Sequence, residues 1–426
     1  MEKIHEKAIL VGVHFKNQKD DHFDYSMEEL KELAHACDVE VVGTVSQKLD
    51  RVNSAHYIGK GKIDEVAAML EHFEGNLVIF NDELSPAQIK NLEAQLECKV
   101  IDRTLLILDI FAERAKSREA ILQVEVAKLK YMLPRLIGLR ESLGRQGGGA
   151  GLNNKGSGET KLELDRRRIE KDIAALNKEL DTLVLGRQVQ RKQRKKNEIP
   201  VVSLVGYTNA GKSTIMNALV GLYEDSSHKE VFEKDMLFAT LDTSVRNIKL
   251  QHNKEFLLTD TVGFVDKLPH HLVKAFRSTL EEAAEADLLL HVVDYSNPNY
   301  EKMIDVTNKT LEQMGVKDIP TIYVYNKADL TDLEIPMVKE DSVYLSAKNR
   351  VGINELIEII SKNIFTDYIT CKLLIPFDKG HIVSYFNEHA QIHETTYESE
   401  GTILSLTCKN ADYEHYKQYV FVEKSE

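Results

Sequence analysis

Several residue types that would indicate a special environment are rare or missing from this sequence. Its 426 residues include no tryptophan, eight prolines and four cysteines. The cysteines have no C-x-x-C spacing, so the sequence predicts neither a zinc site nor a disulfide framework. No run approaches the roughly 18 apolar residues of a membrane span, and the N-terminus lacks the apolar stretch of a signal peptide. These absences predict a soluble cytoplasmic protein.

The composition suits a multidomain globular chain. Hydrophobic residues make up 42% of the sequence, enough for several cores, and the length allows two to four domains. The formal net charge is −13, so any positive surface for binding nucleic acid has to be local.

Residues 1–104 alternate strand and helix signals. Apolar or β-branched runs at 8–13, 39–45 and 77–80 alternate with helical spacing at 61–73, and Ser85-Pro86 begins another helix. The segment beginning Ser26-Met27-Glu28-Glu29 resembles a capping box that opens a helix. This order predicts a small parallel α/β domain.

Residues 105–198 have a different character. Two apolar stripes step by four and three residues, which predicts two amphipathic helices that pack as an antiparallel hairpin. The stripes are Leu122, Val126, Leu129, Leu133 and Leu136, and Ile169, Ile173, Leu176, Leu180 and Leu183.

A glycine-rich loop at 144–158 separates the two helices and forms the tip of the hairpin. Neither a helix nor a strand tolerates that glycine density, and basic residues surround the loop. Small residues allow close approach to a crowded surface, and arginines neutralise phosphates, so the tip is a candidate RNA-binding element. The alternative is a solvated helix face with a flexible loop. The candidate RNA-binding residues are Arg145, Gly147, Gly148, Gly149, Gly151, Asn153, Asn154, Lys155, Arg166, Arg167 and Arg168.

Residues 199–365 begin with a phosphate-binding signature. An expected strand at 201–205 leads into a G-x-x-x-x-G-K-S loop at 206–213, and an expected helix follows. Backbone N–H groups of such a loop surround phosphates, Lys212 supplies a positive charge, and the Ser213 hydroxyl can ligate Mg²⁺.

Later strand ends supply the remaining nucleotide contacts. Asp260 ends a strand and can hold a water ligand of Mg²⁺, and Gly263 has a backbone N–H for the γ-phosphate. Asp329 follows another strand, and its carboxylate can accept from N1–H and the exocyclic amine of guanine, whereas adenine would leave it poorly paired. The backbone of 346–348 can meet the guanine O6. Asp294 also follows a strand, and we interpret it as a structural turn residue.

These motifs resemble the P-loop GTPases of the Obg–HflX superfamily, and the glycine-rich loop with its continuation at 159–168 resembles the HflX family within it. The resemblance covers roughly residues 1–365 and implies a P-loop GTPase fold for the central domain. It also implies a first switch at 238–243, in which Thr240 closes on Mg²⁺ and the γ-phosphate. Thr243 stands where the family usually has proline. A loop hydroxyl is the alternative reading of Thr240.

The candidate GTP-binding residues follow from the motifs and the resemblance together. They are Gly206, Tyr207, Thr208, Asn209, Ala210, Gly211, Lys212, Ser213, Thr214, Phe238, Ala239, Thr240, Leu241, Asp242, Asp260, Thr261, Val262, Gly263, Asn326, Lys327, Ala328, Asp329, Ser346, Ala347 and Lys348. Lys212, Thr240 and Gly263 are expected to stabilise the γ-phosphate, and Ser213, Thr240 and, through water, Asp260 are expected to hold Mg²⁺.

One catalytic residue is missing. Ras-like GTPases place a glutamine after the Asp-x-x-Gly segment to orient the attacking water, and this chain has Phe264 there. No catalytic residue is therefore assigned, and intrinsic hydrolysis is expected to be slow. Asn209 matches an asparagine that in some related GTPases helps to hold K⁺, which would supply the missing charge. A partner that orders the switches is the other source, and Asn209 would then be a loop-capping side chain.

Residues 366–426 alternate in places, and a helix signal begins at Gly380, so we expect a small α+β domain of unassigned role. For the whole chain the resemblance implies a monomeric, ribosome-associated GTPase that docks on the large subunit, contacts its rRNA with the hairpin tip and splits or rescues stalled ribosomes under stress. A ribosome-assembly or RNA-processing GTPase is the alternative, and a third is an RNA-binding protein with nucleotide as a structural ligand.

Overall fold

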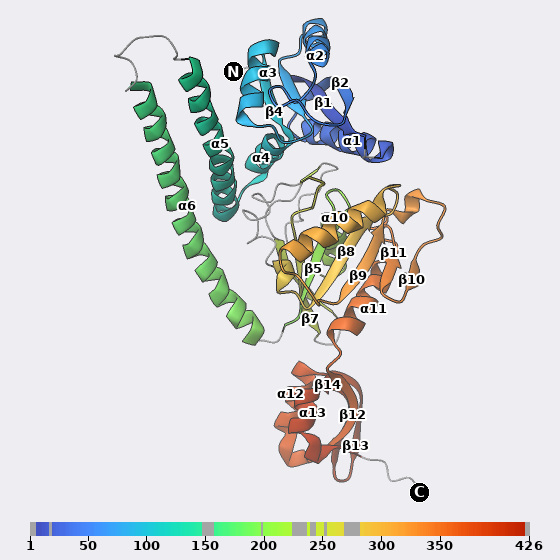
Figure 1. Cartoon of the computed structure of the whole chain (residues 1–426). Helices are drawn as coiled ribbons and strands as arrows, with labels where there is room; N and C mark the ends of the chain where they lie inside the picture. Colours follow the sequence, from blue (N-terminus) through green and yellow to red (C-terminus); the bar gives the residue numbers. More distant parts are fainter. Residues whose placement is uncertain are drawn as a thin grey trace.

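The structure, a computed structural model, describes residues 6–16, 19–146, 157–196, 199–223, 237–238, 244–250, 254–267 and 282–421, with only the backbone at 136–146, 157–162 and 187–196. An N-terminal α/β domain, a helical hairpin, a central α/β domain and a small C-terminal domain follow one another along the chain (Figure 1). The expected fold class is confirmed. Among the described helices, none combines the length and the apolar character that crossing a bilayer requires.

The N-terminal domain is a four-stranded parallel sheet in the order β2-β1-β3-β4. Helices α2 and α3 pack on one face, and α1 and α4 pack on the other. Its elements are β1 (Lys7–Phe15), α1 (Asp20–Ala36), β2 (Glu40–Leu49), α2 (Lys60–Phe73), β3 (Leu77–Phe80), α3 (Pro86–Leu96), β4 (Lys99–Asp102) and α4 (Arg103–Arg114).

The two helix starts expected in this domain had different outcomes. Ser85 caps α3 as predicted, since its side chain accepts from Gln88 N–H and the Gln88 side chain accepts from Ser85 N–H. The capping box at Ser26 was wrong, because α1 begins six positions earlier, at Asp20. Ser26 is buried inside the helix, and its hydroxyl accepts from Asn81 Nδ2 at 2.9 Å. A tertiary hydrogen bond uses the side chain that the local pattern assigned to a cap.

The hairpin consists of α5 (Arg118–Gln146) and α6 (Ser157–Lys196), which lie side by side and antiparallel (Figure 1). Arg118, at the start of α5, makes a bidentate ion pair with Glu179 of α6, at 2.7 and 2.9 Å. The expected stripe on α5 is buried at Leu122 and Val126, and the stripe on α6 is half-buried. A second face of α5 packs into the N-terminal domain, so that helix belongs to both units.

The central domain is a seven-stranded sheet in the order β10-β11-β9-β8-β5-β7-β6. Its edge strands β6 and β10 are antiparallel to their neighbours, and the inner pairs are parallel. Helices α7 and α11 cover one face, and α10 covers the other. The elements are β5 (Val201–Gly206), α7 (Lys212–Tyr223), β6 (Ser244–Lys249), β7 (Glu255–Asp260), β8 (Leu288–Asp294), α10 (Tyr300–Gln313), β9 (Thr321–Asn326), η1 (Ala328–Leu330), β10 (Met337–Lys339), β11 (Ser342–Tyr344) and α11 (Ile353–Ile364).

The C-terminal domain is a three-stranded antiparallel sheet, in the order β12-β14-β13, with α12 and α13 packed on it. The helix expected at Gly380 is present as α12. The elements are β12 (Tyr368–Ile375), η2 (Phe377–Lys379), α12 (Gly380–His389), β13 (Gln391–Glu398), β14 (Gly401–Lys409), α13 (Asn410–His415) and η3 (Lys417–Tyr419).

Candidate nucleotide-binding site

The loop between β5 and α7 has the tight backbone that its glycines predict. Gly206 has a φ of 145°, and a Cβ placed on it would lie 2.2 Å from the carbonyl oxygen of Val292 on the neighbouring strand. Gly211 has a φ of 95°, and its Cβ would lie 2.1 Å from Nδ2 of Asn326. Both positions therefore require glycine, both for backbone conformation and for space.

Lys212, the first residue of α7, points back over this loop. Its Nζ donates to the carbonyl oxygens of Gly206 at 3.1 Å and Tyr207 at 2.7 Å. Burial lowers the pKa of Lys212 to about 8, against the opposing charge of Asp260. A buried ammonium inside a loop of backbone donors is a place where a phosphate is favourable, because the anion restores the solvation that burial removes.

Two of the three residues expected at Mg²⁺, Ser213 and Asp260, lie in contact. Ser213 Oγ donates to Asp260 Oδ2 at 2.7 Å, which brings the start of α7 to the end of β7. Burial raises the pKa of Asp260, against the opposing effects of Lys212 and Ser213. Within the described residues the other carboxylate oxygen, Oδ1, is buried without a hydrogen-bond partner. A buried unpaired carboxylate oxygen beside a hydroxyl fits Mg²⁺ and its water ligands.

Gly263 comes close to the same centre. A Cβ on Gly263 would lie 2.8 Å from Cα of Thr208 and 2.9 Å from Nζ of Lys212. The backbone also joins the two segments, since Thr208 N–H donates to the Phe264 carbonyl at 2.8 Å and Phe264 N–H donates to the Gly206 carbonyl at 3.2 Å. The segment that follows β7 is thus attached directly to the phosphate loop.

The candidate guanine-recognition segments meet at Asn326. Its Nδ2 donates to the Ala210 carbonyl at 2.9 Å, and its Oδ1 accepts from Ala347 N–H at 3.0 Å, so it joins the phosphate loop to the 346–348 segment. Asp329 is exposed, and Asn349 Nδ2 donates to its Oδ2 at 3.0 Å. An exposed carboxylate beside these loops is placed to accept from a base that enters from solvent.

Lys327 and Asp294 form an ion pair, with 2.8 Å between Nζ and Oδ2. The other carboxylate oxygen of Asp294 accepts from the Ser296 hydroxyl at 2.6 Å. The same oxygen also accepts from the Ser296 N–H at 3.1 Å, and these contacts agree with the interpretation of Asp294 as a turn residue.

The first switch and the candidate K⁺ ligand are described only in part. Phe238 is buried, and its ring centroid lies 4.5 Å from that of Phe111 in α4. Asn209 has a φ of 58°, a left-handed conformation that asparagine tolerates. The remaining candidates of this switch, Ala239, Thr240, Leu241 and Asp242, lie outside the described residues.

The candidate RNA-binding residues are also described only in part. Arg166, Arg167 and Arg168 are exposed on α6; Arg166 pairs with Glu170 at 2.8 Å, and Arg167 pairs with Glu163 at 2.9 Å. The other candidates lie outside the described residues or, for Arg145, have only the backbone described. Two of the three arginines therefore have an intrahelical carboxylate partner.

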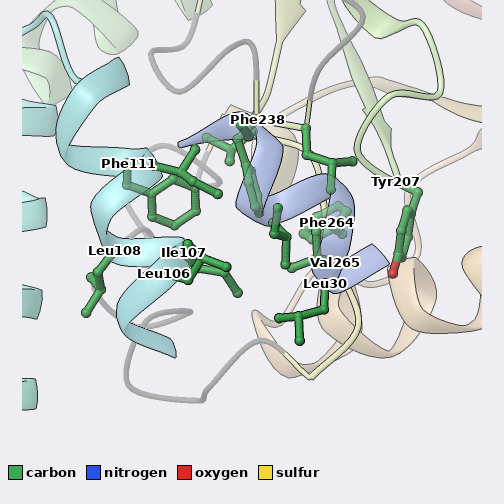
Figure 2. Close-up of a cluster of buried hydrophobic side chains, with 14 of the residues drawn as sticks. Leu30, Leu106, Ile107, Leu108, Phe111, Tyr207, Phe238, Phe264 and Val265 are labelled. Atoms are coloured by element: carbon green, nitrogen blue, oxygen red, sulfur yellow. The ribbon is translucent and has the colours of Figure 1, made fainter. Parts of the chain in front are cut away.

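Phe264 is 2% exposed, and its ring belongs to a hydrophobic cluster that continues from the N-terminal domain into the central domain. Figure 2 shows Leu30 of α1, Leu106, Ile107, Leu108 and Phe111 of α4, and Phe238, Phe264 and Val265 of the central domain around this contact. The residue that replaces the water-orienting glutamine is thus part of the contact between two domains.

One residue of the phosphate loop has a role that sequence reasoning missed. The Tyr207 hydroxyl donates to Oε1 of Glu29 in α1 and accepts from Asp266 N–H at 2.6 Å. Glu29 in turn pairs with Arg103 at the start of α4, and all three side chains are at most 3% exposed. The available signal was an acidic residue between the apolar positions of α1 and an arginine that opens an apolar helix.

Comparison with known proteins finds matches along most of the chain. Family models described as "GTP-binding GTPase N-terminal", "GTP-binding GTPase Middle Region" and "50S ribosome-binding GTPase" match residues 24–112, 114–194 and 201–327. Curated relatives named GTPase HflX include that of Caldanaerobacter subterraneus subsp. tengcongensis, 47% identical over 95% of this chain and 92% of its own. Those of Alkalihalophilus pseudofirmus and Escherichia coli are 46% and 37% identical, over 91% and 93% of this chain and 90% and 92% of their own.

Among solved structures, a GTP-binding protein from Sulfolobus solfataricus in complex with GDP is 24% identical. It covers 85% of this chain and 99% of its own length, with a TM-score of 0.45.

Proposed function

Because the chain belongs to the HflX family of GTPases, and therefore hydrolyses GTP, we propose that it is a ribosome-associated switch. Its GTP form binds the large ribosomal subunit and contacts rRNA with the tip of the α5–α6 hairpin. Binding splits or rescues stalled ribosomes under stress, and hydrolysis to GDP and phosphate releases the protein. We also propose that the protein is a monomer and that it is located in the cytoplasm.

The observation that carries this proposal is the hairpin. The two helices pack along each other with the exposed Arg118–Glu179 pair between them, α5 is packed against the N-terminal domain, and α6 leads into β5 of the nucleotide-binding domain (Figure 1). Its described basic residues near the tip, Arg166 to Arg168, are exposed. Such a projection presents positive charge far from the nucleotide site, as an element that contacts rRNA requires. The family model that matches residues 201–327, described as "50S ribosome-binding GTPase", supports the same partner.

The site assignments belong to the same proposal. Lys212, Ser213, Asp260 and Gly263 would hold the phosphates and Mg²⁺, and the 326–329 and 346–348 segments would hold guanine. Mg²⁺ would neutralise the charge that develops on the phosphates. We also propose domain limits at 198/199 and 365/366. The expected limit at 104/105 falls inside α4 (Arg103–Arg114), which packs on the N-terminal sheet, so we place the end of the first domain after that helix.

Slow intrinsic hydrolysis is part of the proposal, because Phe264 cannot orient water and is buried away from solvent. We expect turnover to rise strongly with ribosomes, and K⁺ at Asn209 is a second source of charge. Turnover in matched K⁺ and Na⁺ buffers, with and without ribosomes, separates the two. Equal rates under all four conditions would contradict both sources.

The ribosome proposal is tested by sedimentation of assembled ribosomes with the protein and GTP, GDP or no nucleotide. We expect free subunits only with GTP. A ribosome-assembly or RNA-processing GTPase would be stimulated by precursor or ribosome-free RNA and would leave assembled ribosomes intact. A nucleotide that served only as a structural ligand would not be turned over faster by either.

A matched pair of variants on α6 locates the contact. Arg168→Glu reverses an exposed charge near the tip, and Lys178→Glu reverses an exposed charge on the same helix farther from it. Deletion of 147–158 removes the tip itself. We expect the deletion and Arg168→Glu to weaken ribosome binding and Lys178→Glu to leave it near the wild-type level. Unchanged binding after the deletion would overturn the proposed role of the hairpin.

A further inference from the structure

The carboxyl edge of the N-terminal sheet faces the phosphate loop of the central domain. In open parallel sheets, ligands bind outside the carboxyl ends of the strands, next to the point where the connections reverse direction. Here Asn81 and Asp82 follow β3, and Arg103 follows β4. Asp82 pairs with Lys267 of the central domain at 2.5 Å, and Arg103 leads through Glu29 to Tyr207. The edge where such a sheet binds a ligand is thus in contact with the nucleotide-binding domain of the same chain.

The N-terminal domain holds Glu29 in a defined position. Arg103 is 2% exposed, so its charge requires a buried counter-charge, and Glu29 provides it. The guanidinium also donates to Asn81 Oδ1 at 3.0 Å and to the Ser26 carbonyl at 3.4 Å. With one carboxylate oxygen of Glu29 committed to Arg103, the other accepts from Tyr207. The Tyr207 hydroxyl therefore meets an acceptor that the other domain fixes.

The same hydroxyl is attached to the segment that contacts the terminal phosphate in P-loop GTPases. It accepts from the N–H of Asp266, three residues beyond Gly263. The segment is held to the phosphate loop at its other end by the backbone bonds of Phe264. If Gly263 moves when a γ-phosphate is present or absent, the N–H of Asp266 moves relative to the hydroxyl. In that case the hydrogen bond from Tyr207 to Glu29 is strengthened or lost.

On the far side, the chain of contacts continues into the hairpin. Asp102, next to Arg103, accepts from the Tyr131 hydroxyl at 2.8 Å and from Arg135 Nη2 at 3.0 Å, and both of these residues lie in α5. The Arg135 guanidinium also stacks 3.1 Å from the centre of the Tyr131 ring. Adjacent residues of the turn between β4 and α4 therefore make the two contacts: Asp102 binds α5, and Arg103 binds Glu29.

We propose that Tyr207 is a positioning residue that couples the nucleotide state at Gly263 to the N-terminal domain and the hairpin, through Glu29 and the Asp102–Arg103 turn. Two states of one buried hydrogen-bonded chain would then be favoured differently by GDP and GTP. By linkage, a partner that binds the hairpin changes the affinity for the nucleotide by the same factor by which the nucleotide changes the affinity for that partner. This inference depends on the GTPase activity and not on the identity of the hairpin's partner.

The test compares three forms of the full chain with the wild type. Tyr207→Phe removes only the hydroxyl. The paired change Glu29→Met with Arg103→Met removes the buried ion pair and the acceptor together, because replacing one partner alone would strand a buried charge. Tyr385→Phe is the matched control, since it removes a tyrosine hydroxyl that donates to Asp412 at 2.8 Å within the C-terminal domain.

Two quantities are measured without any ribosome. One is the ratio of affinities for GDP and a non-hydrolysable GTP analogue, and the other is the difference in amide hydrogen exchange at 24–31 and 120–135 between the two bound states. We expect the wild type and Tyr385→Phe to show the exchange difference. Tyr207→Phe and the paired variant should each shift the ratio by about fivefold or more and abolish the difference in α5. A protein that carries Tyr207→Phe together with the paired change should show little further shift in the affinity ratio, since both changes act on one chain of hydrogen bonds.

A ratio within about twofold of the wild type in Tyr207→Phe, or an unchanged nucleotide-dependent difference in α5, would overturn the proposal. So would the absence of any such difference in the wild type, or additive effects in the combined variant. If Tyr207→Phe fails to fold, the paired variant alone decides by the same readouts. None of these outcomes depends on ribosome binding.

Discussion

The hydroxyl of Ser213 donates a hydrogen bond to Asp260, with 2.7 Å between Oγ and Oδ2. This contact joins the helix after the phosphate loop to the strand end where a Mg²⁺ water is expected. Asp260→Asn keeps the shape but removes the negative charge. We expect its apparent Mg²⁺ affinity in the GTP-bound state to fall by about 10- to 100-fold, because partners that orient metal ligands contribute that much. This affinity is measured by titrating Mg²⁺ while following GTP hydrolysis and the binding of a non-hydrolysable analogue.

Ser203→Ala is the control for this change. The Ser203 hydroxyl is buried in β5, and within the described residues it has no hydrogen-bond partner, so its loss leaves the metal site intact. A Mg²⁺ dependence of Asp260→Asn equal to that of Ser203→Ala would contradict the assignment.

Base specificity is predicted to depend on Asp329. The carboxylate is exposed and accepts from Asn349 Nδ2 at 3.0 Å. In Asp329→Asn an amide would face the N1–H and amine of guanine, so GDP affinity should fall by about two orders of magnitude or more. Xanthosine diphosphate presents an acceptor in place of the amine and should bind the variant better than GDP does. Asp332→Asn, which neutralises another exposed carboxylate nearby, should leave guanine preferred.

The sequence predicted the parts of this site that local chemistry determines. Gly206 and Gly211 predict a loop whose backbone only glycine can adopt, and the structure leaves no room for a Cβ at either position. Ser85 and Gln88 predicted the start of α3 in the same way. Such signals work because the residues that interact lie within a few positions of one another.

The contact between Tyr207 and Glu29 could not be predicted in that way. The two residues are 178 positions apart in the sequence. The local sequence indicates a loop residue at Tyr207 and a charged residue on a helix at Glu29, and neither pattern indicates the other residue. Burial of Glu29 becomes visible only once α1, α4 and the phosphate loop are brought together. Ser26 was misread for the same reason, because its partner, Asn81, lies in another element.

Nucleotide affinity is predicted to fall as the pH rises through the pKa of Lys212. Burial lowers that pKa from 10.5 to about 8, so the ammonium that binds phosphate predominates below pH 8 and is progressively lost above it. A bound phosphate raises the pKa, so protons are taken up on binding and the affinity for GDP decreases between pH 8 and 10. Nucleotide-free stability has the opposite slope there, because the unfolded state binds more protons. In Lys212→Arg, whose guanidinium does not titrate in this range, the affinity should change less with pH.

A second titrating residue is predicted to reduce the stability of the central domain in acid. Burial, with a smaller effect of Lys212, lowers the pKa of His291 to about 4, and its ring stacks on Tyr323 at 5.2 Å. The unfolded state binds more protons between pH 6.5 and 4, so the contribution of His291 is complete above pH 6.5 and lost on acidification. The loss approaches about 3 kcal/mol by pH 4.

Denaturant unfolding at several pH values, compared between the wild type and His291→Phe, isolates this contribution. The phenylalanine keeps an aromatic ring beside Tyr323 and does not titrate. The variant should lose less stability than the wild type between pH 6.5 and 4. Parallel losses in the two proteins would assign the acid sensitivity to other groups.

Restoring the missing glutamine is predicted not to restore catalysis. Phe264 is 2% exposed within the cluster that joins the N-terminal and central domains, so Phe264→Gln would bury an amide among apolar side chains. Loss of apolar burial together with an unsatisfied amide should lower the free energy of unfolding by about 3 kcal/mol. Turnover without a partner should not rise, because the side chain at this position is directed into the cluster (Figure 2) and is not free to orient a water. Phe264→Leu is the matched control, with a smaller destabilisation and the same low turnover. Faster hydrolysis by the glutamine variant without loss of stability would mean that residue 264 leaves the cluster when GTP binds, and the interdomain contact would then have to open during each catalytic cycle.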